Sequence, residues 1–210
     1  MSLRNTPQNY GTVAKWIHWL TAGLFLASYI SIYYEIWFTP GLPPPGEPRD
    51  PAYWISLQIH LSIGVSIFVL VLLRIIWRLM NKPPNEEPGT RLEHFAARAG
   101  HYALYLFMII QPILGYIGTS VDTEFFFLFD IPKFADTPLF EPLVVNGLGM
   151  TFQEFEVPMD FIHKEVFGRW VIWILIVGHI SAALYHHYIR KDRTMYKMTN
   201  EAHHAPQQTQ

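Results

Sequence analysis

Histidine is the residue type with which this chain could do chemistry. The sequence holds ten His and no Cys among 210 residues. The absence of Cys excludes disulfides, thiolate metal sites, iron–sulfur clusters and covalently attached c-type haem. Imidazole is then the strongest metal ligand available, and it also handles protons near neutral pH. Six of the ten lie in or beside long apolar stretches: His18, His60, His101, His163, His179 and His186.

Four apolar stretches position these histidines, at about residues 16–38, 54–79, 101–119 and 170–189. Each has the length that a helix needs to cross a hydrocarbon core about 30 Å thick. Trp and Tyr gather at their ends, as in the aromatic belts of membrane proteins. Only 15% of the residues are charged, against about a quarter in soluble domains. We therefore expect an all-α membrane protein, a four-helix bundle forming one domain over residues 1–210.

The basic residues predict the orientation of the bundle. Eleven Lys and Arg lie in the N-terminal segment, the connection after the second stretch and the C-terminal segment. The other two connections and their flanks hold four basic residues and twelve acidic ones. By the positive-inside rule both termini are expected to be cytoplasmic and the acidic side periplasmic. The net charge of −2 excludes the basic footprint of nucleic-acid binding.

The connection between the third and fourth stretches, about residues 120–160, is the long periplasmic one. A structureless loop of this length is unusual, so it is expected to pack on the bundle or to hold short helices. Its Phe residues suggest a lid on the outer mouth of the bundle. The polar tail with His203 and His204 is expected to be disordered and without a role.

The depths of four histidines fall into two layers. His18 lies at the inner start of the first stretch and His179 in the inner half of the fourth, whereas His60 and His163 lie near the outer ends. Two stacked pairs of imidazoles are the arrangement that holds two b-type haems in a helix bundle. Two other interpretations stay open. The histidines could be hydrogen-bonded packing residues, or a zinc site, although the stretches lack HxxxH and HExxH patterns.

Five motifs resemble the bacterial cytochrome b561 family of integral membrane cytochromes. They are AKWIHWLTAGL, QIHLSIGVSIFVLVLLRIIWRLMNKPP, GHYALYLFMIIQPILGYIG, FFFLFDIP and VGHISAALYHHYIRKDRTMYKM, in that order along nearly the whole chain. The resemblance implies a four-helix bundle in the bacterial inner membrane. It also implies two b haems that pass electrons between the outer face and a quinone.

The haem ligands of the family match His18, His60 and His179 within these motifs, and His163 is the fourth match. His163 precedes His179 by 16 residues, where the family generally has 14. On a regular helix 16 residues turn the side chain by about 160°, to nearly the opposite face. Either His163 precedes the helix on a loop, or the helix contains bulges that restore its phase. Glu165 has the 14-residue spacing, but a carboxylate is a poor haem ligand.

Three further residues are candidates for contact with a haem propionate or a quinone. Arg74 carries a charge that could neutralise a propionate, whereas Arg78 better fits the ordinary positive-inside belt. His101 opens the third stretch at inner depth, where packing or interfacial anchoring is the other interpretation. His186 lies seven residues after His179 and is a candidate for quinone contact or proton handling.

The activity that the resemblance implies is superoxide:ubiquinone oxidoreduction, in which superoxide becomes dioxygen and ubiquinone is reduced. Lys164 and Arg169 flank His163 and could form a basic funnel for the superoxide anion. The acidic outer side would repel that anion, and it fits equally well a docking face for a basic periplasmic redox protein. A third hypothesis is a membrane protein without redox function, such as a transporter or an assembly factor, which predicts no cofactor.

Overall fold

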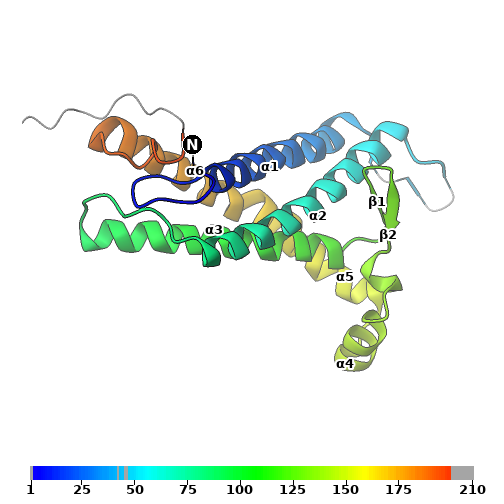
Figure 1. Ribbon diagram of the computed structural model, residues 1–210. Helices are drawn as coiled ribbons and strands as arrows, with labels where there is room; N and C mark the ends of the chain where they lie inside the picture. Colours follow the sequence, from blue (N-terminus) through cyan, green and yellow to red (C-terminus); the bar gives the residue numbers. More distant parts are fainter. Residues whose placement is uncertain (1, 42, 45–46, 200–210) are drawn as a thin grey trace, which may run out of the picture.

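The computed structural model describes residues 2–41, 43–44 and 47–199 of the chain. Three long helices come first, α1 (Thr12–Phe38), α2 (Pro51–Met80) and α3 (Arg91–Ile117). A fourth, unbroken helical stretch consists of α5 (Phe152–Phe161), η3 (Ile162–Val171), α6 (Ile172–Leu184) and η4 (Tyr185–Arg190). Figure 1 shows these four stretches packed side by side along one axis. His203 and His204 lie outside the described residues.

Both ends of the described chain meet at the same end of the bundle, which we call the inner end. There the Asn85 amide donates to the Pro7 carbonyl at 2.9 Å, and the Tyr10 amide donates to the Lys197 carbonyl at 3.3 Å. The α1–α2 connection lies at the opposite, outer end (Figure 1). This arrangement agrees with the predicted topology, in which both termini share one side. That this side is cytoplasmic stays a prediction.

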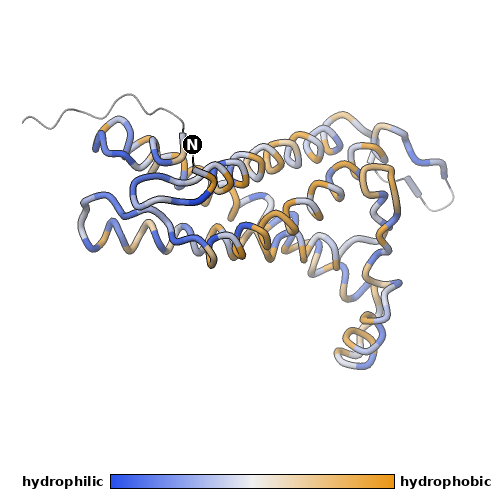
Figure 2. Tube along the Cα trace, in the orientation of Figure 1, coloured by the Kyte–Doolittle hydropathy of each residue, from blue (hydrophilic) through white to orange (hydrophobic). Residues whose placement is uncertain are grey.

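Within the described residues, three helical stretches are long and apolar enough to cross a membrane: α2, α3 and Phe152–Arg190. α1 has 27 residues but does not belong to this set. Of the four predicted transmembrane helices, three are therefore candidates in the structure, and a membrane span by α1 stays a prediction. Large apolar side chains on the helices face outward, for example Leu26, Ile174 and Val177, which are 64%, 70% and 58% exposed. Figure 2 shows hydrophobic colours along the middle of the bundle and hydrophilic colours at its inner end. Such a surface suits lipid rather than water.

Two helices begin earlier than predicted, because polar first turns conceal their starts in the sequence. α3 begins at Arg91 rather than near 101, where Thr90 and Glu93 form a capping box. α5 begins at Phe152 rather than near 170, and Thr151 and Glu154 form a second capping box there. Each box satisfies backbone donors that the first turn of a helix leaves free. The loop predicted at about 120–160 is therefore shorter and ends at Thr151.

The fold is mostly helical, as predicted, but the loop also contains a β-hairpin that was not predicted. Strands β1 (Thr123–Phe125) and β2 (Phe129–Ile131) pair antiparallel. The aromatic and β-branched residues of this segment favour a strand over a helix. The hairpin packs along the side of α2, whereas a lid over the outer mouth was expected. The expected short helices follow it, as η1 (Phe134–Asp136), η2 (Glu141–Val145) and α4 (Asn146–Leu148).

The main core lies in the middle of the bundle. Ile63, Ile67 and Val71 form one face of α2 at four-residue spacing and meet Phe107 and Met108 of α3 and Ile172 of α6. Between membrane helices such contacts act through van der Waals packing rather than through exclusion of water. The core separates the outer ends of the helices from the inner ends, and candidate site residues lie on both sides of it.

Candidate functional site

The outer pair consists of His60 on α2 and His163 on η3. Their ring centres are 6.3 Å apart, with the rings inclined at 75°. The Nδ1 of His60 lies 3.1 Å from the Ser28 carbonyl oxygen and 3.0 Å from the Ser28 hydroxyl oxygen. The Nδ1 of His163 lies 3.0 Å from the Gln111 carbonyl oxygen. Because a carbonyl oxygen only accepts, Nδ1 of each ring carries the proton and Nε2 keeps its lone pair for a ligand.

A π-helical segment brings His163 to face His60. Residues 162–171 form η3, whose hydrogen bonds run from residue i to i+5 and whose turns are therefore wider than those of an α-helix. The spacing of 16 residues to His179 thus keeps both rings on the inside of the bundle. Of the two explanations for the shifted spacing, the structure has the bulged helix and not the loop.

Side chains of other helices donate to two carbonyls of the wide turns. The Gln111 side chain donates to the His163 carbonyl at 3.0 Å, and the Tyr29 hydroxyl donates to the Gly168 carbonyl at 3.0 Å. Glycine makes the close approach to His163 possible, because a Cβ at Gly115 would lie 2.8 Å from the Cε1 of His163. The outer pair is therefore held by α1, α3 and η3 together.

The inner cluster contains three imidazoles rather than the predicted two. The ring centre of His179 lies 6.2 Å from that of His18 and 5.9 Å from that of His101. Arg74 joins them through Nη2, 3.2 Å from the Nδ1 of His18, and its Nε donates to the Tyr105 hydroxyl at 3.1 Å. Since a guanidinium only donates, the Nδ1 of His18 accepts in this contact.

The spacing of both pairs fits two imidazoles on opposite sides of one metal ion. A ligating ring nitrogen lies about 2 Å from its metal and about 1 Å from its own ring centre, so the two centres are about 6 Å apart. The observed 6.3 and 6.2 Å agree with this value, and so does the 5.9 Å between His101 and His179. The zinc interpretation gains no support, because no group of three or more His, Cys, Asp or Glu within the described part of the chain could hold a metal ion.

The two cations predicted as a superoxide funnel are both ion-paired. Lys164 Nζ lies 2.5 Å from an Asp160 carboxylate oxygen, and Arg169 Nη1 lies 2.7 Å from a Glu165 carboxylate oxygen. Both pairs join residues four apart on the surface of the fourth helical stretch. Lys164 and Arg169 are thus close to His163 in the sequence, but in the structure each is ion-paired with a carboxylate.

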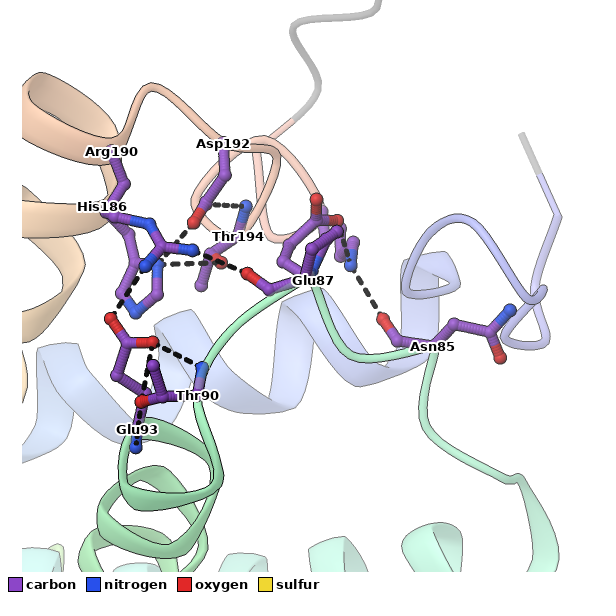
Figure 3. A network of polar contacts seen from close by, with 10 residues as sticks. Asn85, Glu87, Thr90, Glu93, His186, Arg190, Asp192 and Thr194 are labelled. Atoms are coloured by element: carbon purple, nitrogen blue, oxygen red, sulfur yellow. Dashed lines mark hydrogen bonds and ion pairs between the residues drawn. The ribbon is translucent and has the colours of Figure 1, made fainter.

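His186 belongs to a polar network at the inner end, shown in Figure 3. Its Nδ1 lies 2.5 Å from an Asp192 carboxylate oxygen, and the other oxygen of Asp192 accepts from the Thr194 amide at 2.9 Å. Beside it Arg190 contacts Glu93 at 2.7 Å. The network joins the segment after η4 to the start of α3, and it lies apart from the inner cluster, about two helical turns beyond His179.

Sequence reasoning missed several polar partners of the histidines. The backbone carbonyls of Ser28 and Gln111 contact His60 and His163. The Tyr105 hydroxyl accepts from Arg74. A polar residue inside an apolar stretch was the available signal, and Gln111 directly before Pro112 was the clearest example. Asp192 lies outside the stretches and gave no such signal.

Comparisons with known proteins agree with this geometry. The family model described as prokaryotic cytochrome b561 matches residues 9–201. Cytochrome b561 homolog 2 of Escherichia coli (strain K12) is 29% identical over 214 aligned residues, which cover 96% of this chain and 97% of that protein. Members of the family bind haem b and transfer electrons in bacterial membranes. The match over nearly the whole chain, the membrane-spanning helices and the facing histidines lead to one conclusion: this chain belongs to the prokaryotic cytochrome b561 family.

Proposed function

We propose that the protein carries electrons across the bacterial inner membrane, from a periplasmic donor to ubiquinone. In this proposal His60 and His163 hold one b haem and His18 and His179 hold a second. The observation that carries it is the pair of facing imidazoles on each side of the core, both at the spacing of a shared metal. When bound, the haems supply one-electron redox chemistry.

The residues of the chain hold the rings, exclude water and place charge. Ser28 and Gln111 fix the outer rings with Nε2 free. The core around Ile67 and Phe107 keeps water out of the space between the two sites. Arg74 places a positive charge beside His18, where it would compensate a propionate.

The acceptor is proposed to be ubiquinone at the inner end, where reduced quinone must take up protons. Asp192 holds the Nδ1 of His186, and this leaves Nε2 of His186 to pass a proton, as in other carboxylate-oriented imidazoles. His101, the third ring of the inner cluster, is the second candidate for quinone contact. Both residues are reached from the cytoplasmic side in the proposed orientation.

The proposed donor is a basic redox protein. All four basic residues of the acidic outer side are engaged: Lys133 with Asp136, Lys164 with Asp160, Arg169 with Glu165, and Arg49 over the Trp54 ring at 4.1 Å. Three of these four charges are ion-paired and the twelve acidic residues of this side outnumber them, so the field of the outer side attracts cations and repels anions. Superoxide is the second candidate, favoured by the exposed positions of Lys164 and Arg169, whose side chains are 62% and 64% accessible.

A reduced-minus-oxidised spectrum of the purified protein tests the haem proposal. We expect a b-type α-band and two haems per chain in a pyridine haemochrome assay. A spectrum without this band would leave the third hypothesis, a membrane protein without redox function.

Rapid mixing at several salt concentrations distinguishes the two donors. Reduction by a basic c-type cytochrome is expected to slow as salt rises, because salt screens its attraction to the acidic side. Reduction by superoxide is expected to be slow at low salt and to speed up as the repulsion is screened. Fast reduction by superoxide at low salt would make superoxide the donor.

A further inference from the structure

The β1–β2 hairpin uses the side of α2 as if it were a neighbouring strand. The Gln58 side chain donates to the Asp122 carbonyl at 3.0 Å and accepts from the Glu124 amide at 2.8 Å. The Ser62 hydroxyl accepts from the Phe126 amide at 2.9 Å. Its own proton points to the Gln58 carbonyl at 2.7 Å, with the Glu124 carbonyl as a second, longer contact at 3.3 Å. Both α2 side chains are fully buried. This edge of β1 therefore has partners for its backbone groups, which a hydrocarbon environment requires.

The hairpin tip points toward the middle of α2. Asp122 and Glu124 lie at Gln58, whereas Phe126 lies at Ser62, one turn further from the outer end of the helix. Ser62 follows Pro51, the first residue of α2, by eleven residues, or about 16 Å of helix. Counting 20 residues, the length of a membrane crossing, outward from the basic belt at Arg78 gives a boundary near Gln58. The tip thus lies beyond this boundary, on the hydrocarbon side.

The composition of the hairpin changes along its length in the same direction. Glu124 and Asp130 are paired residues of the two strands, at the level of Gln58 and Trp54. The tip is apolar and exposed: Phe126, Phe127, Leu128 and Phe129 are 40%, 50%, 77% and 57% accessible. Phe126 and Phe127 have φ values of +47° and +59°, where Gly, Asn or Asp are usual in such turns. Large apolar side chains thus occupy backbone positions that disfavour them.

We propose that the hairpin tip, residues 126–129, inserts into the outer leaflet and contacts lipid acyl chains. The occupant follows from the position of the tip, because its exposed apolar side chains lie inside the boundary near Gln58, beside α2, a helix apolar enough to span a membrane. The long loop then has two parts. The hairpin lies in the membrane beside α2, and the segment from η1 to α4 stays available to a soluble donor. This inference rests on the membrane span of α2 and not on the proposed electron transfer.

The absence of Cys makes the proposal directly testable by spin labelling of the full-length protein in lipid nanodiscs. Leu128→Cys is the test variant, Leu73→Cys on α2 is the lipid reference and Leu3→Cys is the aqueous reference. All three leucines are half exposed or more, at 77%, 50% and 66%, so the label has room. The measurements are the collision rates of each nitroxide with oxygen, which enters hydrocarbon, and with a water-soluble nickel chelate.

We expect the oxygen-to-nickel ratio at position 128 to be roughly tenfold above that at position 3 and close to that at position 73, since the polar chelate is excluded from hydrocarbon. A ratio at position 128 like that at position 3 would place the tip in water and overturn the proposal. Low collision rates with both reagents would overturn it as well, because they would show the tip covered by protein, such as a second copy of the chain.

Discussion

The outer pair and the inner cluster have the same ring spacing but different surroundings. Their facing rings are 6.3 and 6.2 Å apart. In the outer pair neutral backbone carbonyls hold both Nδ1 atoms. In the inner cluster a guanidinium contacts Nδ1 of His18, and a third imidazole lies as close to His179 as His18 does. The outer pair thus fits a shared iron in spacing and in protonation, and the inner cluster fits it in spacing.

Replacement of single histidines is expected to have the largest effect, a loss of haem from one of the two sites. His60→Ala and His179→Ala are each expected to lose one haem of two, because a haem held by two imidazoles loses an axial ligand. The haem-to-protein ratio and the amplitude of the α-band measure this loss.

His101→Ala is the matched control within the inner cluster and is expected to keep both haems, whereas His18→Ala keeps one. The reverse result would make His101 the partner of His179. Retention of both haems in His60→Ala would show that the outer pair is not a ligand pair.

Gly115→Ala should disturb the outer pair alone. The added Cβ would lie 2.8 Å from the Cε1 of His163, so the ring must leave the position in which it faces His60. We expect the outer haem content to fall and the inner content to stay, as resolved by redox titration of the α-band. Gly100→Ala on the same helix is the control, since a Cβ there meets nothing within 4 Å. Equal effects of the two variants would contradict the steric argument.

Arg74→Gln should shift the inner potential without moving the outer one. A positive charge beside a haem disfavours the oxidised iron, so its removal is expected to lower the inner potential by on the order of 50 mV. Potentiometric titration measures both potentials in one sample, and the outer value serves as reference.

Arg78→Gln is the matched variant. Arg78 lies 5.8 Å over the same Tyr105 ring that Arg74 faces at 5.4 Å, so a smaller shift is expected. A larger shift of the inner potential in Arg78→Gln than in Arg74→Gln would show that Arg78, and not Arg74, is the cation that acts on the inner site.

The smallest effect is expected at Asp192, beyond the inner cluster. Burial raises the pKa of its carboxyl, but hydrogen bonds from His186 and from the amide and hydroxyl of Thr194, with the charge of His186, hold this pKa below its ordinary value. The ionised form therefore stabilises the fold above the ordinary pKa of about 3.9, and this contribution is lost as pH falls through the lower native pKa.

Asp192→Asn should lower stability at pH 7 by about 1 kcal/mol, and the difference from the unmodified protein should disappear in acid. Thermal unfolding in detergent as a function of pH measures it. Asp130→Asn, an exposed hairpin residue, is the control and should change little. A difference that persists below the native pKa of Asp192 would exclude ionisation as its cause.

The sequence was sufficient to predict the apolar helices, the shared side of the termini and the histidines that face each other. Apolar length and depth along a helix carry that information directly. It was not sufficient for the place of His101 beside His179, or for the roles of Ser28 and Gln111, since these depend on contacts between helices. For the shifted spacing of His163 the sequence left two explanations open, a loop or a bulged helix. The 3.6-residue period of an α-helix does not show where a helix changes to the wider π-helical turns seen in η3. The hairpin was missed because its Phe residues were interpreted as the apolar face of a lid rather than as strand residues.

The π-helical segment has a consequence for the biogenesis of the protein. A membrane helix normally satisfies its own backbone within the helix, and in this segment the carbonyls of His163 and Gly168 also accept from Gln111 of α3 and Tyr29 of α1. These two contacts between helices can form only once α1 and α3 are in place. This helical stretch is also the last of the four to be synthesised, so α1 and α3 are already in the membrane when it arrives. The order of the helices along the chain thus provides the partners in time, and a circular permutant that began with this stretch would have to insert it alone.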